Sequence, residues 1–292
     1  MESFIGLDVE QSQSKISLHL DAYIQETLDI YKEHPARKII RPKSTPMQPG
    51  NVLTSADAQE IPDKQKQAFY RSMVARFQFA ETWVRFDISY TVGQLARFCA
   101  SAGSSHFAAL HHLMEYLEKH PSFKLDYHKG QTKTTGLDGY CDVDLGTSNS
   151  RRSITGNIFC YNGAPIAWKS KLQKSVALSN AEAEYYLASL GAVEVIYLRQ
   201  LLRNMGFGPT SPTLVYQDNT ACIEWTNNVI GGRERAKHID IQKHFAHEAA
   251  QIGHLRLKRV STGDQLADVF TKSLQQAQFA TIISLLLRRM WP

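Results

Sequence analysis

Two aspartates one residue apart are the first candidates for chemistry in this sequence. Asp142 and Asp144 lie in the short segment 139–145, which glycine-containing turns bound on both sides and which is typical of a β-strand. Successive strand side chains point to opposite faces, so both carboxylates share one face. At about 5 Å and an effective dielectric of about 20, two such charges repel by about 3 kcal/mol. Such a pair is expected either in open water or around a bound cation.

Three further acids follow on later predicted elements. Glu184 lies in the second turn of a helix predicted over 179–205, and Asp218 directly follows a predicted strand at 213–217. Asp268 lies in the first turns of the last helix predicted for this half of the chain. Taken alone, Glu184 is explained as an exposed helix residue and Asp218 as a helix cap. The question is whether folding gathers these acids around Asp142.

The elements that must position these acids alternate in type. Apolar periodicity and turn residues predict the order β-β-β-α-β-α-α-β-α after residue 136. The first three strands are joined by tight turns and are therefore expected to form an antiparallel meander. The predicted elements are strands 139–145, 154–161, 165–170, 213–217 and 254–260, and helices 179–205, 237–251 and those that begin at 220 and 264.

The first half of the chain has mostly helical patterning. Two short strands precede the helices, and the segment 35–62 is rich in Pro and Lys and should be loop-like. The three histidines of the helix predicted over 105–118 are expected on a solvated face rather than in a metal site. A polar, flexible tract at 129–136 predicts a domain boundary, which divides the chain into 1–135 and 136–292.

The composition limits the class of protein. The chain has 292 residues, a net charge of +5 and a pI near 8.9, which permit a nucleic-acid partner without requiring one. Its four cysteines do not show the C-x-x-C spacing of a zinc site. We therefore expect them to be reduced, buried thiols. The start of the chain does not resemble a signal peptide, and the late apolar run at 282–287 is too short to span a bilayer. We therefore expect an intracellular protein of the cytoplasm, the nucleus or both.

The segments that carry the acids, taken in order, resemble ribonuclease H. They are still more similar to the Pol polyproteins of copia-type long-terminal-repeat retrotransposons. The matching segments are GYCDVD (139–144), RRSITG (151–156), WKSKLQ (168–173), AEY (183–185), DN (218–219), KHID (237–240) and ADVFTK (267–272). In the first half, FIGLDV (4–9), TPM (45–47), YRS (70–72) and RFDISY (85–90) resemble the part that follows a reverse-transcriptase active site. Phe86 stands where the family usually has Pro, and Leu145 where Trp is typical; neither position bears a carboxylate.

The resemblance implies a mixed α/β (α+β) fold in two parts. Residues 136–292 would form a ribonuclease H-like domain, a five-stranded mixed sheet flanked by helices. Residues 1–135 would be the end of a reverse-transcriptase palm with a mostly helical region like a thumb or connection. The adjacent aspartates of a polymerase site do not occur in the chain. No polymerase activity is therefore expected from this chain alone.

The resemblance also implies a site and a reaction. Asp142, Glu184, Asp218 and Asp268 would bind two Mg²⁺ or Mn²⁺ ions about 4 Å apart. With them the chain would be a metal-dependent endonuclease, a hydrolase that cuts the RNA strand of RNA–DNA hybrids. Asp144 would line the same face as an outer acid.

The expected partners are an RNA–DNA hybrid and the missing palm and fingers or the rest of a Pol polyprotein. Cations near the first acids could meet phosphates, although a solvated basic face explains them nearly as well. His238 invites a role in product release or proton handling. The tentative nucleic-acid-binding residues are Arg151, Arg152, Lys169, Lys171, Lys174 and His238.

Two other classes of function remain open at this point. The chain could be a catalytically silent retrotransposon remnant that binds nucleic acid or a partner protein. It could also be a DNA-cutting relative with the same fold, such as an integrase or a resolvase. The complete set of four acids argues against a decayed remnant.

Overall fold

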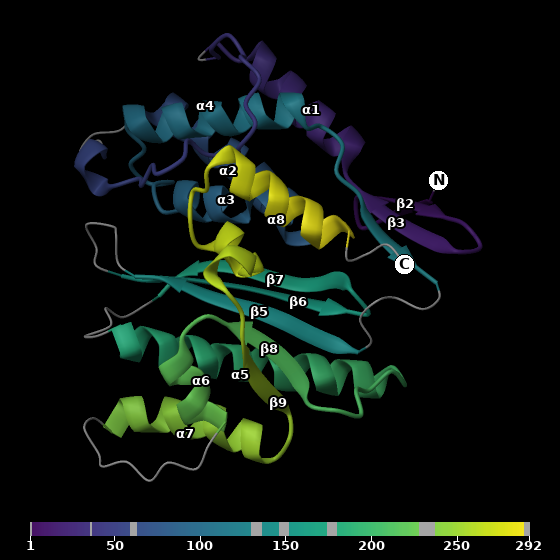
Figure 1. The fold of residues 1–292 in the computed structure, drawn as a ribbon. Coiled ribbons are helices and arrows are strands. Elements are labelled where there is room, and N and C mark those ends of the chain that lie inside the picture. Colours follow the sequence, from purple (N-terminus) through teal and green to yellow (C-terminus); the bar gives the residue numbers. More distant parts are fainter. Residues whose placement is uncertain are drawn as a thin grey trace. The chain divides into compact units, whose positions relative to one another are not determined.

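The computed structural model describes residues 2–35, 37–58, 63–129, 136–145, 152–173, 180–227 and 237–288. The chain divides into two compact units. The first contains Met1–Gln131 together with Lys272–Pro292, and the second contains Thr132–Thr271. Figure 1 shows the elements of both units in sequence colours.

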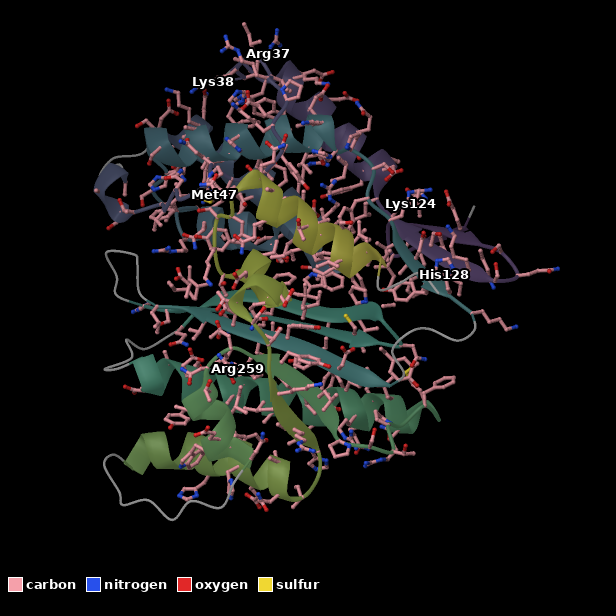
Figure 2. The ribbon with its side chains drawn as sticks, viewed as in Figure 1. Arg37, Lys38, Met47, Lys124, His128 and Arg259 are labelled. Carbon is pink, nitrogen blue, oxygen red and sulfur yellow. The ribbon has the colours of Figure 1, made fainter. Side chains whose placement is uncertain are left out.

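The first unit combines helices with a four-stranded antiparallel sheet. The strands are β1 (Glu2–Phe4), β2 (Leu7–Gln11), β3 (Lys15–His19) and β4 (Leu125–His128), paired in that order. Figure 2 shows Lys124 directly before β4 and His128 at its end, and Lys124 Nζ donates to Glu10 of β2 at 2.8 Å. The helices are α1 (Asp21–Glu33), α2 (Lys64–Trp83), α3 (Ser89–Ala96), α4 (Ser104–Lys119) and α8 (Gln276–Arg288), with 3₁₀ turns η1 (Ser55–Asp57) and η2 (Phe86–Ile88).

A buried ion pair lies in the core of the first unit. The Arg85 guanidinium donates two hydrogen bonds to the Asp87 carboxylate, at 2.9 and 2.8 Å, and the Tyr116 hydroxyl donates a third to it at 2.7 Å. Arg85 also donates to the carbonyl of His120. Buried charges need such complete pairing because desolvation is costly. The segment in which Phe86 replaces the family's Pro is therefore a structural centre of this unit.

The histidines of α4 do not lie on a solvated face, so that prediction was wrong. His106 is fully buried, its Nδ1 accepts from the Gly103 amide, and its Nε2 lies 2.9 Å from the Thr54 carbonyl oxygen. His112 Nε2 lies 3.0 Å from the carbonyl oxygen of Thr45. The irregular segment between α1 and α2 has carbonyl groups that need partners. The α4 imidazoles meet that need.

The second unit contains the predicted five-stranded mixed sheet. The strand order is β7-β6-β5-β8-β9, in which β7, β6 and β5 are antiparallel and β5, β8 and β9 are parallel. Helices α5, α6 and α7 lie on one side of this sheet (Figure 1). The strands are β5 (Leu137–Asp144), β6 (Ile154–Tyr161), β7 (Ala164–Leu172), β8 (Thr213–Gln217) and β9 (Leu255–Arg259), and the helices are α5 (Asn180–Asn204), α6 (Thr220–Asn227) and α7 (Lys237–Gln251).

The two faces of β5 carry different kinds of side chain. Cys141 and Val143 belong to the apolar core formed with α5 and α7, and Gly191 of α5 packs beside the Cys141 Sγ. The alternate residues, Tyr140 and Asp142 among them, face the other side, because strand side chains alternate. The strand therefore separates a structural face from the face that carries the candidate acid.

The region predicted as a helix from residue 264 consists instead of two 3₁₀ segments, η3 (Thr262–Asp264) and η4 (Leu266–Phe270). The Gln265 side chain caps η4 by accepting from the Ala267 amide. At the other end, the Thr271 amide closes the last turn on the Asp268 carbonyl. A longer helix is not formed because η4 is bounded at both ends by these contacts.

The second domain was predicted to run to residue 292, whereas the compact unit ends at Thr271. The physical reason is the apolar face of α8, whose Phe279, Ile282 and Leu286 are buried. The Phe279 ring packs edge-on against Tyr116 of α4 at a centroid distance of 5.9 Å. α8 is thus part of the core of the first unit.

Two expectations about the whole chain can be compared with the described residues. Cys141, Cys160 and Cys222 are buried, Cys99 is half-buried, and none of the four forms a disulfide. In the part of the chain that the structure describes, every helix is too short or too polar to cross a membrane.

Candidate active site

Asp142 and Asp218 are brought level by the parallel pairing of β5 with β8. The register aligns Tyr140 with Tyr216, and the two rings stack with centroids 4.7 Å apart. Two residues further along the chain in each case, Asp142 lies near the carboxyl end of β5, and Asp218 directly follows β8. This edge is where sheets containing parallel strands commonly bind their ligands.

Glu184 approaches these two aspartates from the second turn of α5. Its side chain is buried, and its Oε2 accepts a hydrogen bond of 2.6 Å from the Gln217 side-chain amide. The pKa of Glu184 is raised to about 7, first by burial and also by the charges of Asp218 and Asp142, while hydrogen bonds from Gln217 and Asn219 act in the opposite direction. Two of the predicted acids, Asp142 and Asp218, are therefore close enough to act electrostatically on a third, Glu184.

Gly156 allows Asp268 to approach the same face of the sheet. It pairs directly with Asp142 across β5 and β6. A Cβ added to Gly156 would lie 2.7 Å from both Phe270 Cβ and Thr271 Cγ2. The space that a side chain at position 156 would need is therefore occupied by η4 and Thr271. η4 is the element that carries the buried Asp268.

Two buried hydrogen bonds hold the segment 265–271, which contains η4, against β5. The Gln265 side-chain amide donates to the Cys141 carbonyl at 3.0 Å. The Thr271 hydroxyl donates to Asp142 Oδ2 at 2.6 Å. Asp268 lies between these two anchors in sequence, so its element has a defined place against the Asp142 face.

The chemistry of the acids suits a hard divalent ion, but their present arrangement is not a formed metal site. Carboxylate oxygens are the ligands that Mg²⁺ and Mn²⁺ prefer. Within the described residues, no three Asp, Glu, His or Cys side chains lie close enough together to hold a metal ion. Glu184 and Asp142 are instead hydrogen-bonded to Gln217 and Thr271.

The predicted nucleic-acid contacts are only partly gathered at this site. Arg152 is exposed just before β6, and Lys169 and Lys171 are exposed on β7. The register places both lysines on the α5 face of the sheet, opposite to the face of Asp142. Arg151 and Lys174 lie outside the described residues, as does the side chain of His238, whose backbone belongs to α7.

Sequence reasoning missed the hydrogen-bond donors that hold the acids. These are Thr271, Gln217 and Asn219. Gln217 had a detectable signal, because it follows Thr213 and Val215 at alternate, core-facing positions of one strand, where a polar side chain needs a partner. No comparable local pattern indicated Thr271.

No family model matches the chain. It is 30% identical over 287 residues to the retrovirus-related Pol polyprotein from transposon TNT 1-94 of Nicotiana tabacum, which covers 95% of this chain. It is 32% identical over 282 residues to the corresponding polyprotein from transposon RE1 of Arabidopsis thaliana, covering 96%. The chain belongs to the Pol polyproteins of copia-type transposons. It spans only 21% and 18% of the length of these two relatives.

Two further similarities were found, one to a curated protein and one to a solved structure. Secreted RxLR effector protein 161 of Plasmopara viticola is 34% identical over 130 residues, which are 44% of this chain and 90% of that protein. A solved foamy viral protease-reverse transcriptase in complex with double-stranded DNA aligns with 89% of this chain and 37% of its own, at 12% identity and a TM-score of 0.44. The chain thus corresponds in sequence to a part of a retrovirus-related Pol polyprotein of a transposon.

Proposed function

We propose that the second unit is a metal-dependent endonuclease that hydrolyses the RNA strand of RNA–DNA hybrids, as part of a retrotransposon Pol polyprotein. One observation carries the proposal. Asp142, Glu184 and Asp218 come from two parallel strands and a helix, yet the charges of Asp142 and Asp218 both act on the Glu184 carboxyl and help to raise its pKa. Clustered acids with a raised pKa are typical of functional sites.

The four acids would hold two Mg²⁺ or Mn²⁺ ions, for which their oxygen ligands are suited. When bound, such ions supply an activated water and stabilise the leaving oxygen of a phosphodiester. Glu184 must first lose its proton, because a carboxyl group binds a metal ion in its deprotonated form. The hydrogen bond from Thr271 to Asp142 Oδ2 would keep this carboxylate oriented while Asp142 Oδ1 binds a metal ion.

The substrate proposal depends on the family resemblance and on the basic residues. Arg152 and the predicted contacts Arg151, Lys174 and His238 would meet backbone phosphates, and 2′-hydroxyls would distinguish RNA from DNA. The palm and fingers or other parts of a Pol polyprotein would be partners. We expect no polymerase activity from this chain alone, and an intracellular site of action.

Cleavage of a labelled RNA–DNA hybrid tests the proposal. The purified chain should cut the RNA strand in Mg²⁺ or Mn²⁺ and stop when the metal is chelated. Asp218→Asn should abolish cutting and leave the unfolding transition intact. Asp264→Asn is the matched control, because Asp264 is exposed in η3 and its side chain accepts a hydrogen bond from the nearby Ser261 hydroxyl. Loss of cutting in both variants would contradict the assignment.

A catalytically silent, nucleic-acid-binding or partner-binding remnant is the second candidate. It is favoured by the absence of a formed group of metal ligands among the described residues. Hybrid binding without cleavage in either metal would support this candidate. Equal cleavage of hybrid and duplex DNA would instead indicate a DNA-cutting relative of the same fold.

A further inference from the structure

We propose that the second unit carries a nucleotide-binding pocket between α5 and the outer strands β6 and β7, separate from the four acids. This inference goes beyond hydrolysis of a hybrid and does not depend on it. The pocket would hold a base-sized ring inside and a phosphate at its rim. Such a nucleotide could be free or part of a single strand.

The pocket follows from strand register. Asn157 pairs with Cys141 of the core-facing side of β5, and Asn157 also pairs with Lys169 of β7. Thr155 pairs with Lys171 in the same way. All these side chains therefore face α5, because paired residues share a face of the sheet. They form a polar strip at the outer strands, whereas the part of this face at β5 is apolar.

Between this strip and α5 lies a hollow of about 130 Å³. Tyr186, Leu190 and Val193 of α5 line it, at spacings that put them on one side of the helix. An apolar cavity of about 150 Å³ is large enough to bind a benzene molecule. The hollow is therefore of the size of one small ring, with an aromatic side chain at its wall. Bases of single strands commonly stack on such side chains.

Gln173 gives the hollow an unused hydrogen-bond donor. Its side chain is 4% exposed and lines the hollow, and its Nε2 has no hydrogen-bond partner among the described residues. Its backbone amide donates to the Ser153 carbonyl at 2.8 Å, which fixes its position. A buried donor without a partner costs about 1–3 kcal/mol. A ligand that accepts this hydrogen bond, such as a base edge, would remove that cost.

The charge of the lining selects an anion. Two ammonium groups, those of Lys169 and Lys171, belong to the lining and are exposed, against one carboxylate, that of Glu194. A phosphate at the two lysines and a ring beside Tyr186 together match the chemistry of one nucleotide.

Equilibrium binding to the full chain in chelator tests the pocket. The probes are adenosine 5′-monophosphate and a labelled single-stranded octanucleotide. The double variant Lys169→Gln/Lys171→Gln should weaken binding by on the order of tenfold, because two phosphate contacts are lost. Gln173→Met, which keeps the size but not the donor, should weaken it by at least about threefold. Lys66→Gln, an exposed lysine of α2, is the control and should bind as the wild type.

The outcomes separate this pocket from the proposed nuclease. Asp218→Asn should lose hybrid cleavage but keep nucleotide binding. Binding of both probes would support a site open to free nucleotides, and lysine-dependent binding of the octanucleotide alone would support one for strand nucleotides. The proposal is overturned if neither probe binds, or if the double lysine variant binds both as the wild type does. The lysines are exposed, so that variant should fold even if Gln173→Met does not.

Discussion

The hydroxyl of Thr271 donates a 2.6 Å hydrogen bond to Oδ2 of Asp142, across 129 positions of sequence. Both residues are buried. The bond joins the end of η4 to the central strand β5, and it brings the element of Asp268 to the strand of Asp142. A side chain outside the predicted acid set thus connects two members of that set.

Replacing Thr271 by Val should lower the free energy of unfolding by about 1–3 kcal/mol, because a buried carboxylate loses its donor. Cleavage of the hybrid should fall as well, since Asp142 and η4 are no longer held together. Chemical denaturation and a cleavage assay measure the two effects. Thr271→Ser keeps the hydroxyl and should retain most of the activity. Equal activity of the Val and Ser variants would show that the bond is dispensable.

Adding a methyl group at Gly156 should displace η4. The new Cβ would be 2.7 Å from Phe270 Cβ and Thr271 Cγ2 and 3.0 Å from the Ala267 carbonyl oxygen. Overpacking of this kind costs about 1–3 kcal/mol. We expect Gly156→Ala to lose cleavage while its circular dichroism spectrum stays close to that of the wild type.

The matched control is Gly263→Ala in η3, where an added Cβ would approach only the Ser261 hydroxyl, at 4.0 Å. This variant should keep both stability and cleavage. A Gly156→Ala protein with full activity would contradict the placement of η4 against β6.

Glu184 should make the metal-free protein less stable as pH rises. Its pKa is about 7 in the folded state, against 4.5 for an ordinary glutamate carboxyl in water. Between these two values the folded state binds more protons than the unfolded state, so the free energy of unfolding falls with pH. The full effect is at most about 3 kcal/mol. This loss of stability is complete above pH 7 and absent below pH 4.5.

The difference between the wild type and Glu184→Gln isolates this effect. The Gln variant keeps an acceptor for Gln217 and should be the more stable protein at pH 8, but not at pH 4. The same proton opposes metal binding, so Mn²⁺ affinity of the wild type should increase by about tenfold per pH unit below 7 and then level off. A pH-independent difference in stability would refute the raised pKa.

Breaking the buried pair of Arg85 and Asp87 should unfold much of the first unit. Asp87→Asn leaves the guanidinium without its counter-charge, which typically costs about 3–5 kcal/mol. Glu26→Gln is the control, because Glu26 forms an exposed ion pair with Arg76. That change should cost about 0–1 kcal/mol. Thermal unfolding of both variants gives the comparison, and similar losses in the two would contradict the structural role of the buried pair.

The local elements were largely readable from sequence. Helix α7 begins and ends as predicted, and α5 differs from its predicted range by one residue at each end. Hydrophobic periodicity and turn residues are local properties, and they set element type and the face on which a side chain lies. The alternation along β5 likewise separated Asp142 from Cys141 correctly.

The tertiary structure decided what lies against each face. Sequence gave no reason for the α4 histidines to serve the carbonyls of a distant loop, or for α8 to join the first unit. Lys169 and Lys171 were grouped with the acids because they are near them in sequence. The register of β6 and β7 places them on the opposite face.

By itself, the sequence determined the acids, their order along the chain and the elements that carry them. Only the tertiary structure decided how these acids are held. The parallel register of β5 with β8 brings Asp142 level with Asp218, Gly156 makes room for η4, and Thr271 binds Asp142. Such contacts join segments up to 129 residues apart. They depend on long-range register and packing, which no local pattern encodes.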